Sequence, residues 1–187
     1  MQENMKKMLA ALFIFASTVA NAQVSSNEEL RKMVSADRLE REAASVDWSV
    51  TDSNDKARAS RVMEMLAAGK IETAEDFYNA GVIFQHGDSP DDFKLAFSFA
   101  TIAARLAPEH RAPKWLAAAA WDRYMMGKKL PQWYGTQSQF FKETGKTSLY
   151  PLLADAVSDA ERSEASIPPL ATIIADIEAK NKAMRQE

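Results

Sequence analysis

Cysteine is absent from this chain of 187 residues. Its absence excludes disulfides, thiol catalysis, cysteine-based zinc sites, iron–sulfur clusters and a lipid anchor on cysteine. Only two histidines are present, so a metal ion would depend on carboxylates, and we expect neither a metal nor another cofactor. A fold without disulfides must be stabilised by its core, and a chain of this length can bury one.

Glycine is also scarce, with 6 residues, and the chain has no Gly-rich phosphate loop, Gly-x-Ser-x-Gly elbow or His-Glu-x-x-His motif. The 23 basic and 26 acidic residues give a formal net charge of −3. No basic surface for nucleic acid is expected from such a balance. No motif indicates an enzyme class, so enzymatic and binding functions both stay open.

The N-terminus holds the one long apolar run. Lys6 and Lys7 precede the apolar residues 8–19, and Ala20-Asn21-Ala22 follows. This order is typical of a secretory signal peptide, so we predict that residues 1–22 are removed before Gln23. The protein is then periplasmic or secreted. No later run is long enough to span a bilayer, so no stable membrane insertion is expected after cleavage.

Apolar residues recur at helical spacing through the rest of the chain and predict an all-α fold. Short links between the segments predict about seven helices stacked as antiparallel hairpins in a single domain. The expected helices are 25–45, 55–68, 73–86, 89–106, 113–126, 149–164 and 171–184, with a helical turn at 138–143 and no strand. We assign residues 23–47 to an N-terminal helix or arm and 48–187 to the helical domain.

Some local signals are clearer than others. Thr73 with Asp76, and Ser89 followed by Pro90, mark two helix starts. The segment 73–86 is apolar nearly all round, so it should be a central helix. Residues 47–55 are rich in Asp, Ser and Asn and predict a break, with Trp48 tucked against the core.

Polar residues that interrupt apolar surface gather between residues 79 and 137. His86 ends a buried helix, next to Gln85, where an imidazole caps the last carbonyls or acts as a general base or metal ligand. Its partner in the second case would be Asp88 or Asp122. The first interpretation is favoured, because histidine is a common residue at helix ends.

Asp122 and Arg123 follow the apolar run 115–121. Both border apolar surface and need partners. They form either a clamp on the following loop, which we favour, or an arginine site for an anion.

That loop, residues 131–137, carries Gln132, Tyr134 and Gln137 around Gly135, which is expected in an unusual backbone conformation. Its amides and hydroxyls can satisfy the loop's own backbone or face a ligand.

Taken together, these motifs resemble an uncharacterised bacterial family of helical domains of unknown function, marked by a Gln-His-Gly turn and a Tyr-Gly-Thr-Gln loop. The resemblance covers roughly residues 52–169, through Gln85-His86-Gly87, Trp115-Leu116, Asp122-Arg123 and residues 134–137. It implies no activity, but it places the polar residues in one signature and leaves the first helix outside. A weaker similarity, in the Gly87-Asp88-Ser89-Pro90 turn, is to tetratricopeptide and Sel1-like hairpins.

These observations predict a binding or interaction module for a protein, peptide or small-molecule ligand. Its polar groove would be formed by the Gln85-His86 turn and the loop 132–137. The candidate ligand-binding residues are Gln85, His86, Asp122, Arg123, Gln132, Tyr134 and Gln137. One alternative is a hydrolase with His86 as general base, oriented by Asp122, and with Arg123 or Gln137 holding an oxyanion. Another is a purely structural role for the polar motif.

Overall fold

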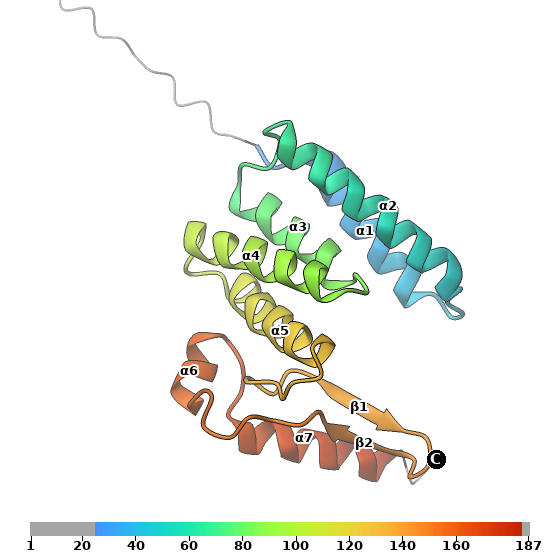
Figure 1. Cartoon of the computed structure of the whole chain (residues 1–187), viewed down its shortest axis with the longest axis vertical. Helices are drawn as coiled ribbons and strands as arrows, with labels where there is room; N and C mark the ends of the chain where they lie inside the picture. The colour runs from blue at the N-terminus through green and yellow to red at the C-terminus, as the bar shows by residue number, and fades with distance from the viewer. Residues whose placement is uncertain (1–24, 185–187) are drawn as a thin grey trace, which may run out of the picture.

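A computed structural model describes residues 25–184, and the predicted signal peptide, residues 1–22, lies outside the described residues. The described chain forms seven α-helices and one two-stranded hairpin (Figure 1). The elements are α1 (Glu28–Glu42), α2 (Trp48–Ala67), α3 (Ala74–Gln85), α4 (Pro90–Leu106), α5 (Arg111–Gly127), β1 (Ser138–Phe141), β2 (Lys146–Leu149), α6 (Asp159–Glu164) and α7 (Leu170–Ala183). The all-α prediction is confirmed.

Side chains at the predicted positions start α3 and α4. Thr73 and Asp76 exchange hydrogen bonds with each other's backbone at the start of α3, and Ser89 and Asp92 do the same at α4. Such capping boxes satisfy N–H groups that a helix start leaves free. The turn between the two helices requires glycine, because a Cβ on Gly87 would lie 2.5 Å from the Cβ of Asp92.

Small residues bring α3, α4 and α5 close together. Ala96, Ala100 and Ala103 on α4 are completely buried, as are Ala119 and Ala120 on α5. On α3, a Cβ added to Gly81 would lie 3.3 Å from the carbonyl oxygen of Ala96. These small side chains let the helix backbones approach closely, and α3, α4 and α5 form the centre of the stack (Figure 1).

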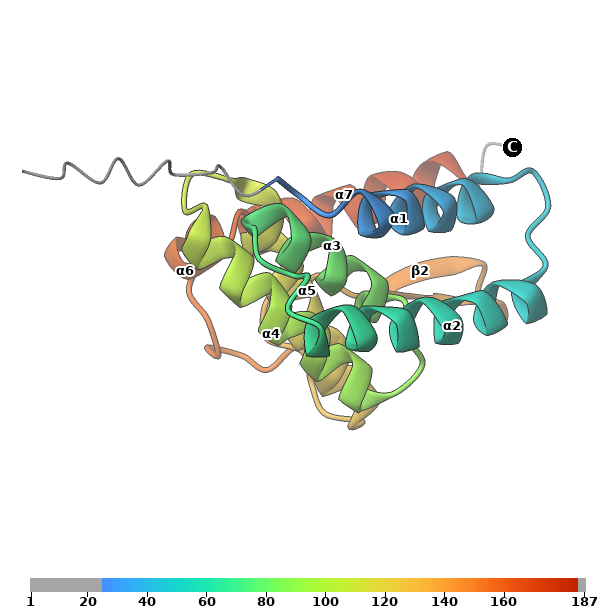
Figure 2. The ribbon, with the colours of Figure 1, turned by 90° about the horizontal axis from the view of Figure 1, so that it is seen from above.

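The first helix belongs to the same core. Leu30 of α1 is completely buried in a cluster with Val62 and Met65 of α2 and Ile83 of α3. Figure 2 shows α1 and α7 on one side of the stack and α2 and α4 on the other. Residues 25–42 are thus packed into the fold and are not a free arm. No helix between residues 25 and 184 combines the length and apolarity that crossing a bilayer requires.

Two predictions in the C-terminal part were wrong. Residues 138–143 contain no helical turn, because β1 pairs antiparallel with β2, Phe140 lying opposite Thr147. Phenylalanine and threonine favour strands, and Gly145 at φ 62° suits the turn. The helix expected at 149–164 is reduced to α6, since Pro151 and a left-handed Asp155 precede it and the backbone there bonds to Gln132.

The predicted break at 47–55 was also wrong. Asp47 caps α2 by accepting hydrogen bonds from the N–H groups of Ser49 and Val50, so the helix starts at Trp48. Trp48 itself is 59% exposed and is not tucked against the core. The turn-forming residues are tolerated within α2 because Asp55 is engaged in ion pairs with Arg41 and Arg58.

Candidate functional site

The carboxylate of Asp122 on α5 holds the loop 132–137 in place by hydrogen bonds. This carboxylate is completely buried and accepts hydrogen bonds from the backbone N–H groups of Trp133 (2.8 Å), Tyr134 (3.0 Å) and Thr136 (2.9 Å). It also accepts one from the Thr136 hydroxyl at 2.8 Å. All of this acceptor capacity is directed at the loop, so Asp122 does not orient His86.

Gln132 completes the same loop. Its side chain is 0% exposed, and its amide nitrogen donates to the carbonyl oxygens of Gln137 (2.9 Å) and Tyr150 (2.8 Å). Its amide oxygen accepts from the N–H of Gln137 at 2.8 Å. Gly135 has φ 87°, the left-handed conformation expected there. The backbone of the loop is therefore satisfied by two buried side chains, Gln132 within the loop and Asp122 of α5.

Arg123 connects this loop to the end of α3. Its Nη1 donates to the carbonyl oxygen of Gln85, and its Nε lies 3.4 Å from Oε1 of Gln137. Burial, with the nearby charge of Arg41, lowers the pKa of Arg123. The last carbonyls of a helix carry partial negative charge and stabilise a cation. The geometry thus matches the favoured clamp between α3 and the loop.

His86 has a partner that the sequence did not indicate. Its Nδ1 lies 2.7 Å from Oδ2 of Asp37 on α1, which replaces the expected Asp88 or Asp122. Asp37 is 1% exposed. Burial acts to raise the pKa of Asp37, but the hydrogen bond to His86 and the charges of His86, Arg41 and Arg58 outweigh it and lower this pKa.

The His86–Asp37 pair lies at the edge of a buried ion-pair network between α1 and α2. Arg58 contacts Asp37, Glu40 and Asp55, and Arg41 contacts Asp37 and Asp55. The hydrogen bonds that Arg58 donates to Glu40 are the main cause that raises the pKa of Arg58. Three carboxylates thus surround two guanidinium groups and the imidazole, which holds the ends of α1, α2 and α3 together.

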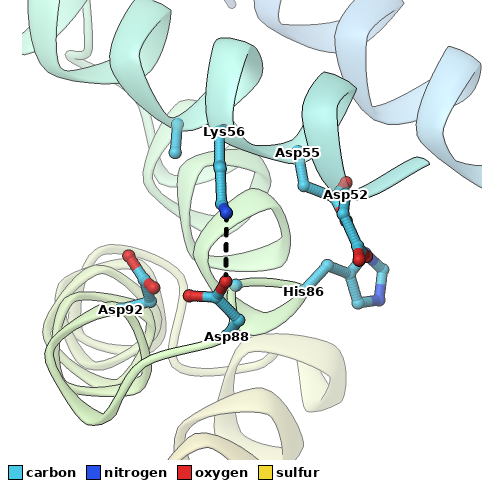
Figure 3. Close-up of a pocket in the computed structure, with 8 residues that line it drawn as sticks. Asp52, Asp55, Lys56, His86, Asp88 and Asp92 are labelled. Carbon is cyan, nitrogen blue, oxygen red and sulfur yellow. Dashed lines mark ion pairs between the residues drawn. The ribbon is translucent and has the colours of Figure 1, made fainter. Parts of the chain in front are cut away.

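His86 also borders two cavities. One, of about 40 Å³, lies toward α2 between Asp52, Asp55, Lys56, Asp88 and Asp92, where Lys56 reaches Asp88 at 3.4 Å (Figure 3). It has room for water but not for a larger ligand. Within residues 25–184, no three His, Asp or Glu side chains are arranged to share a metal ion.

The second cavity, of about 420 Å³, belongs to a larger groove centred on Tyr78. It lies between α1 and α3, and the lining residues include Val34, Asp37, Arg38, Arg41, Tyr78, Val82 and His86. Tyr78 also lines a hollow of about 470 Å³ with Ala107, His110 and Pro113, and one of about 380 Å³ with Arg111, Trp115 and Ser166. We call these three hollows together the Tyr78 groove.

Tyr134 lies elsewhere, in a hollow of about 690 Å³ that includes Phe97, Arg105 and Lys114. Of the seven candidate residues, only His86 and Tyr134 line any of these five cavities, and they line different ones. Gln85, Arg123 and Gln137 are brought together by hydrogen bonds, whereas Asp122 and Gln132 support the loop from within.

Sequence reasoning missed Asp37 and Tyr78 as site residues. One signal for Asp37 was present. Leu30, Val34, Asp37 and Arg41 recur at helical spacing on the apolar face of α1, and a carboxylate on such a face needs a buried partner.

No protein-family model, curated protein or solved structure matches this chain, so the resemblance described above stays a prediction.

Proposed function

We propose that the protein is a periplasmic or secreted binding module that holds a peptide segment of a partner protein in the Tyr78 groove. One observation carries the proposal. A single half-buried aromatic side chain borders three adjoining hollows, which are lined by α1, α3 and α5. A surface that continues through three adjoining hollows suits an extended or helical peptide better than a compact small molecule.

The chemistry of the groove supports a peptide ligand. Tyr78 and Trp115 offer large aromatic surfaces, and Trp115 is 46% exposed. Tyrosine, tryptophan and arginine are the residues that contribute most at protein interfaces. Arg111 borders the groove without an ion pair among residues 25–184, and Arg38 and His86 also border it. Since Arg38 and His86 are already paired with Glu42 and Asp37, Arg111 is the residue that favours a peptide with a carboxylate beside its apolar residues.

The polar motif has a supporting part in this proposal. Asp122, Gln132 and Arg123 hold the loop 132–137 against α5 and the end of α3, and Asp37 fixes His86 at one end of the groove. A binding surface made of helices is most specific when its shape is held rigid. The structural interpretation of the loop residues and the binding interpretation of the module are therefore compatible.

A selection experiment tests the proposal. A phage-displayed library of random peptides is selected on immobilised protein comprising residues 23–187. Tyr78→Ala and Trp115→Ala should each weaken the selected peptides at least about tenfold, as expected for interface aromatic residues. Trp48→Ala is the matched control, since Trp48 is exposed on α2 and lines none of the hollows. Selected peptides that bind Tyr78→Ala and Trp115→Ala as tightly as the wild type would contradict the proposal.

The hydrolase alternative keeps one supporting observation, the 2.7 Å contact between His86 and Asp37. A buried carboxylate on one imidazole nitrogen is how a general base is oriented in known hydrolases. The alternative then requires the His86–Asp37 pair in place of His86–Asp122. Its test is hydrolysis of p-nitrophenyl acetate. A rate above buffer that His86→Gln removes supports it, and a rate equal to buffer contradicts it.

A further inference from the structure

The β1–β2 hairpin carries apolar side chains that the fold does not cover. All four residues of β1 are exposed, Phe140 by 52% and Phe141 by 40%. A two-stranded sheet has two outer edges, and each presents backbone N–H and C=O groups that another strand can bind. The outer edges of β1 and β2 differ in which of their backbone groups have a hydrogen-bond partner.

On the outer edge of β2, a side chain of α7 occupies the outward residue Thr147. The side chain of Asn181 accepts a hydrogen bond from the N–H of Thr147 and donates one to its C=O, both at 2.7 Å. A primary amide has the same donor and acceptor as a peptide group, so Asn181 takes the place of a neighbouring strand. Figure 1 shows α7 along the β2 side of the hairpin.

The outer edge of β1 is open. Because Thr147 directs its backbone groups to Asn181, the opposite residue, Phe140, must direct its own groups away from β2. By the same alternation, the backbone groups of Ser138 also point outward. No group between residues 25 and 184 bonds the N–H or C=O of Ser138 or Phe140.

The open edge is short and has defined ends. The N–H of Thr136, the preceding outward position, is taken by Asp122. The chain turns at Lys142, beyond Phe141. Two residues, Ser138 and Phe140, therefore offer four free backbone groups. An added antiparallel strand satisfies all four when its own outward residues match these two positions.

We infer that two copies of this protein pair antiparallel through β1, related by a two-fold axis at Gln139. Ser138 of each copy then lies opposite Phe140 of the other, and the two residues exchange both backbone hydrogen bonds. This register is symmetric, as an isologous dimer requires. Shifting it by two residues leaves open groups unpaired, so the geometry specifies one arrangement.

The side chains are compatible with this pairing. β1 has no charged residue, and Lys142 would lie opposite Thr136, so like charges do not meet across the axis. The two Phe140 rings occupy diagonal positions on one face of the four-stranded sheet, about 7–8 Å apart and within reach of each other. Asn181 occupies Thr147 on the outer edge of β2, so this edge cannot offer the two outward residues that pairing through β1 uses.

Because only two residues of each copy exchange backbone hydrogen bonds, the interface should be smaller than the roughly 1,200–2,000 Å² of stable complexes, and association should be weak and concentration-dependent. The inference does not depend on the Tyr78 groove, which lies on other elements.

The lack of native cysteine allows a clean cross-linking test. At the two-fold axis, Gln139 of one copy lies opposite Gln139 of the other. The two form a non-hydrogen-bonded pair, with a Cα separation of about 4.5 Å. A disulfide spans about 4.4–6.8 Å, so Gln139→Cys should form covalent dimers under mild oxidation. Ser148→Cys is the matched control, because Ser148 is the exposed partner of Gln139 on β2. Equal cross-linking of the two variants overturns the inference.

Analytical ultracentrifugation of the cysteine-free protein gives an independent test. The sedimentation coefficient should rise with concentration, and Phe140→Lys should abolish the rise by placing a charge on the new sheet. Leu106→Lys is the control, because Leu106 is 55% exposed on α4, far from the hairpin in the chain. A monomer at every concentration, or a dimer unaffected by Phe140→Lys, overturns the inference.

Discussion

Replacing Asp122 with alanine should destabilise the protein strongly, although Asp122 lines none of the five cavities described above. The substitution removes the acceptor from three backbone N–H groups and one hydroxyl in the loop 132–137. A buried donor without a partner costs about 1–3 kcal/mol, and the lower end applies because the loop is half-buried and water can replace part of the loss. The expected fall in unfolding free energy is therefore about 3–4 kcal/mol.

Thermal and urea denaturation of residues 23–187 measure this effect. At about 2–4 °C per kcal/mol for a domain of this size, the midpoint should fall by about 6–15 °C. Asp88→Ala is the control, since Asp88 is a surface residue whose pair with Lys56 contributes at most about 1 kcal/mol. If Asp122→Ala unfolds within about 1 kcal/mol of the wild type, the carboxylate does not hold the loop and our reasoning is refuted.

Three further perturbations test the ion-pair network and the turn before α4. Asp37→Ala removes the carboxylate that pairs with His86, while Arg41 keeps Asp55 and Arg58 keeps Glu40. The cost in chemical denaturation should therefore be about 3 kcal/mol, the lower end for breaking a buried pair. Although burial acts in the opposite direction, the surrounding cations lower the pKa of Asp37, so its stabilisation is present above about pH 4 and is lost as pH falls through that lowered pKa. Asp37→Asn should therefore flatten the acid side of a stability-versus-pH curve, and an unchanged slope would contradict the assignment. Gly87→Ala places a Cβ 2.5 Å from Asp92 and should cost about 1–3 kcal/mol in thermal unfolding, whereas Gly127→Ala, with its nearest neighbour at 3.3 Å, should change stability by less than about 1 kcal/mol.

Helix starts were the most predictable part of the fold. The capping boxes of α3 and α4 join residues three positions apart, so the interaction lies inside one turn and does not depend on the rest of the molecule. The start of α2 at Asp47 was not predicted. The residue type of Asp47 was recognised as a turn or cap, but the helix that it starts is supported by Asp55 pairing with Arg41 of another helix.

The hairpin was missed because its stability comes from outside its own sequence. Residues 138–149 alternate weakly, and a two-stranded sheet alone is marginal in water. Here Asn181 of α7 completes one edge, and Gln132 and Asp122 anchor the chain that leads into β1. None of these partners is close in sequence to all of β1 and β2.

The candidate site shows the same division. Gln132, Gln137 and Asp122 were correctly marked as residues that need partners, and their partners lie within 18 residues along the chain. His86 was marked too, but its partner Asp37 lies 49 residues away on a helix that the resemblance left outside the signature. Tyr78 was not marked as a site residue, because the hollows that it borders exist only between packed helices.

The amino-acid sequence by itself determined that the chain is helical and where several helices begin, because apolar spacing and capping act over a few residues. Only the tertiary structure decided which polar groups meet, which sheet edge is closed and where a groove opens. Those outcomes depend on how helices far apart in the chain stack against one another, and local composition carries no record of that stacking.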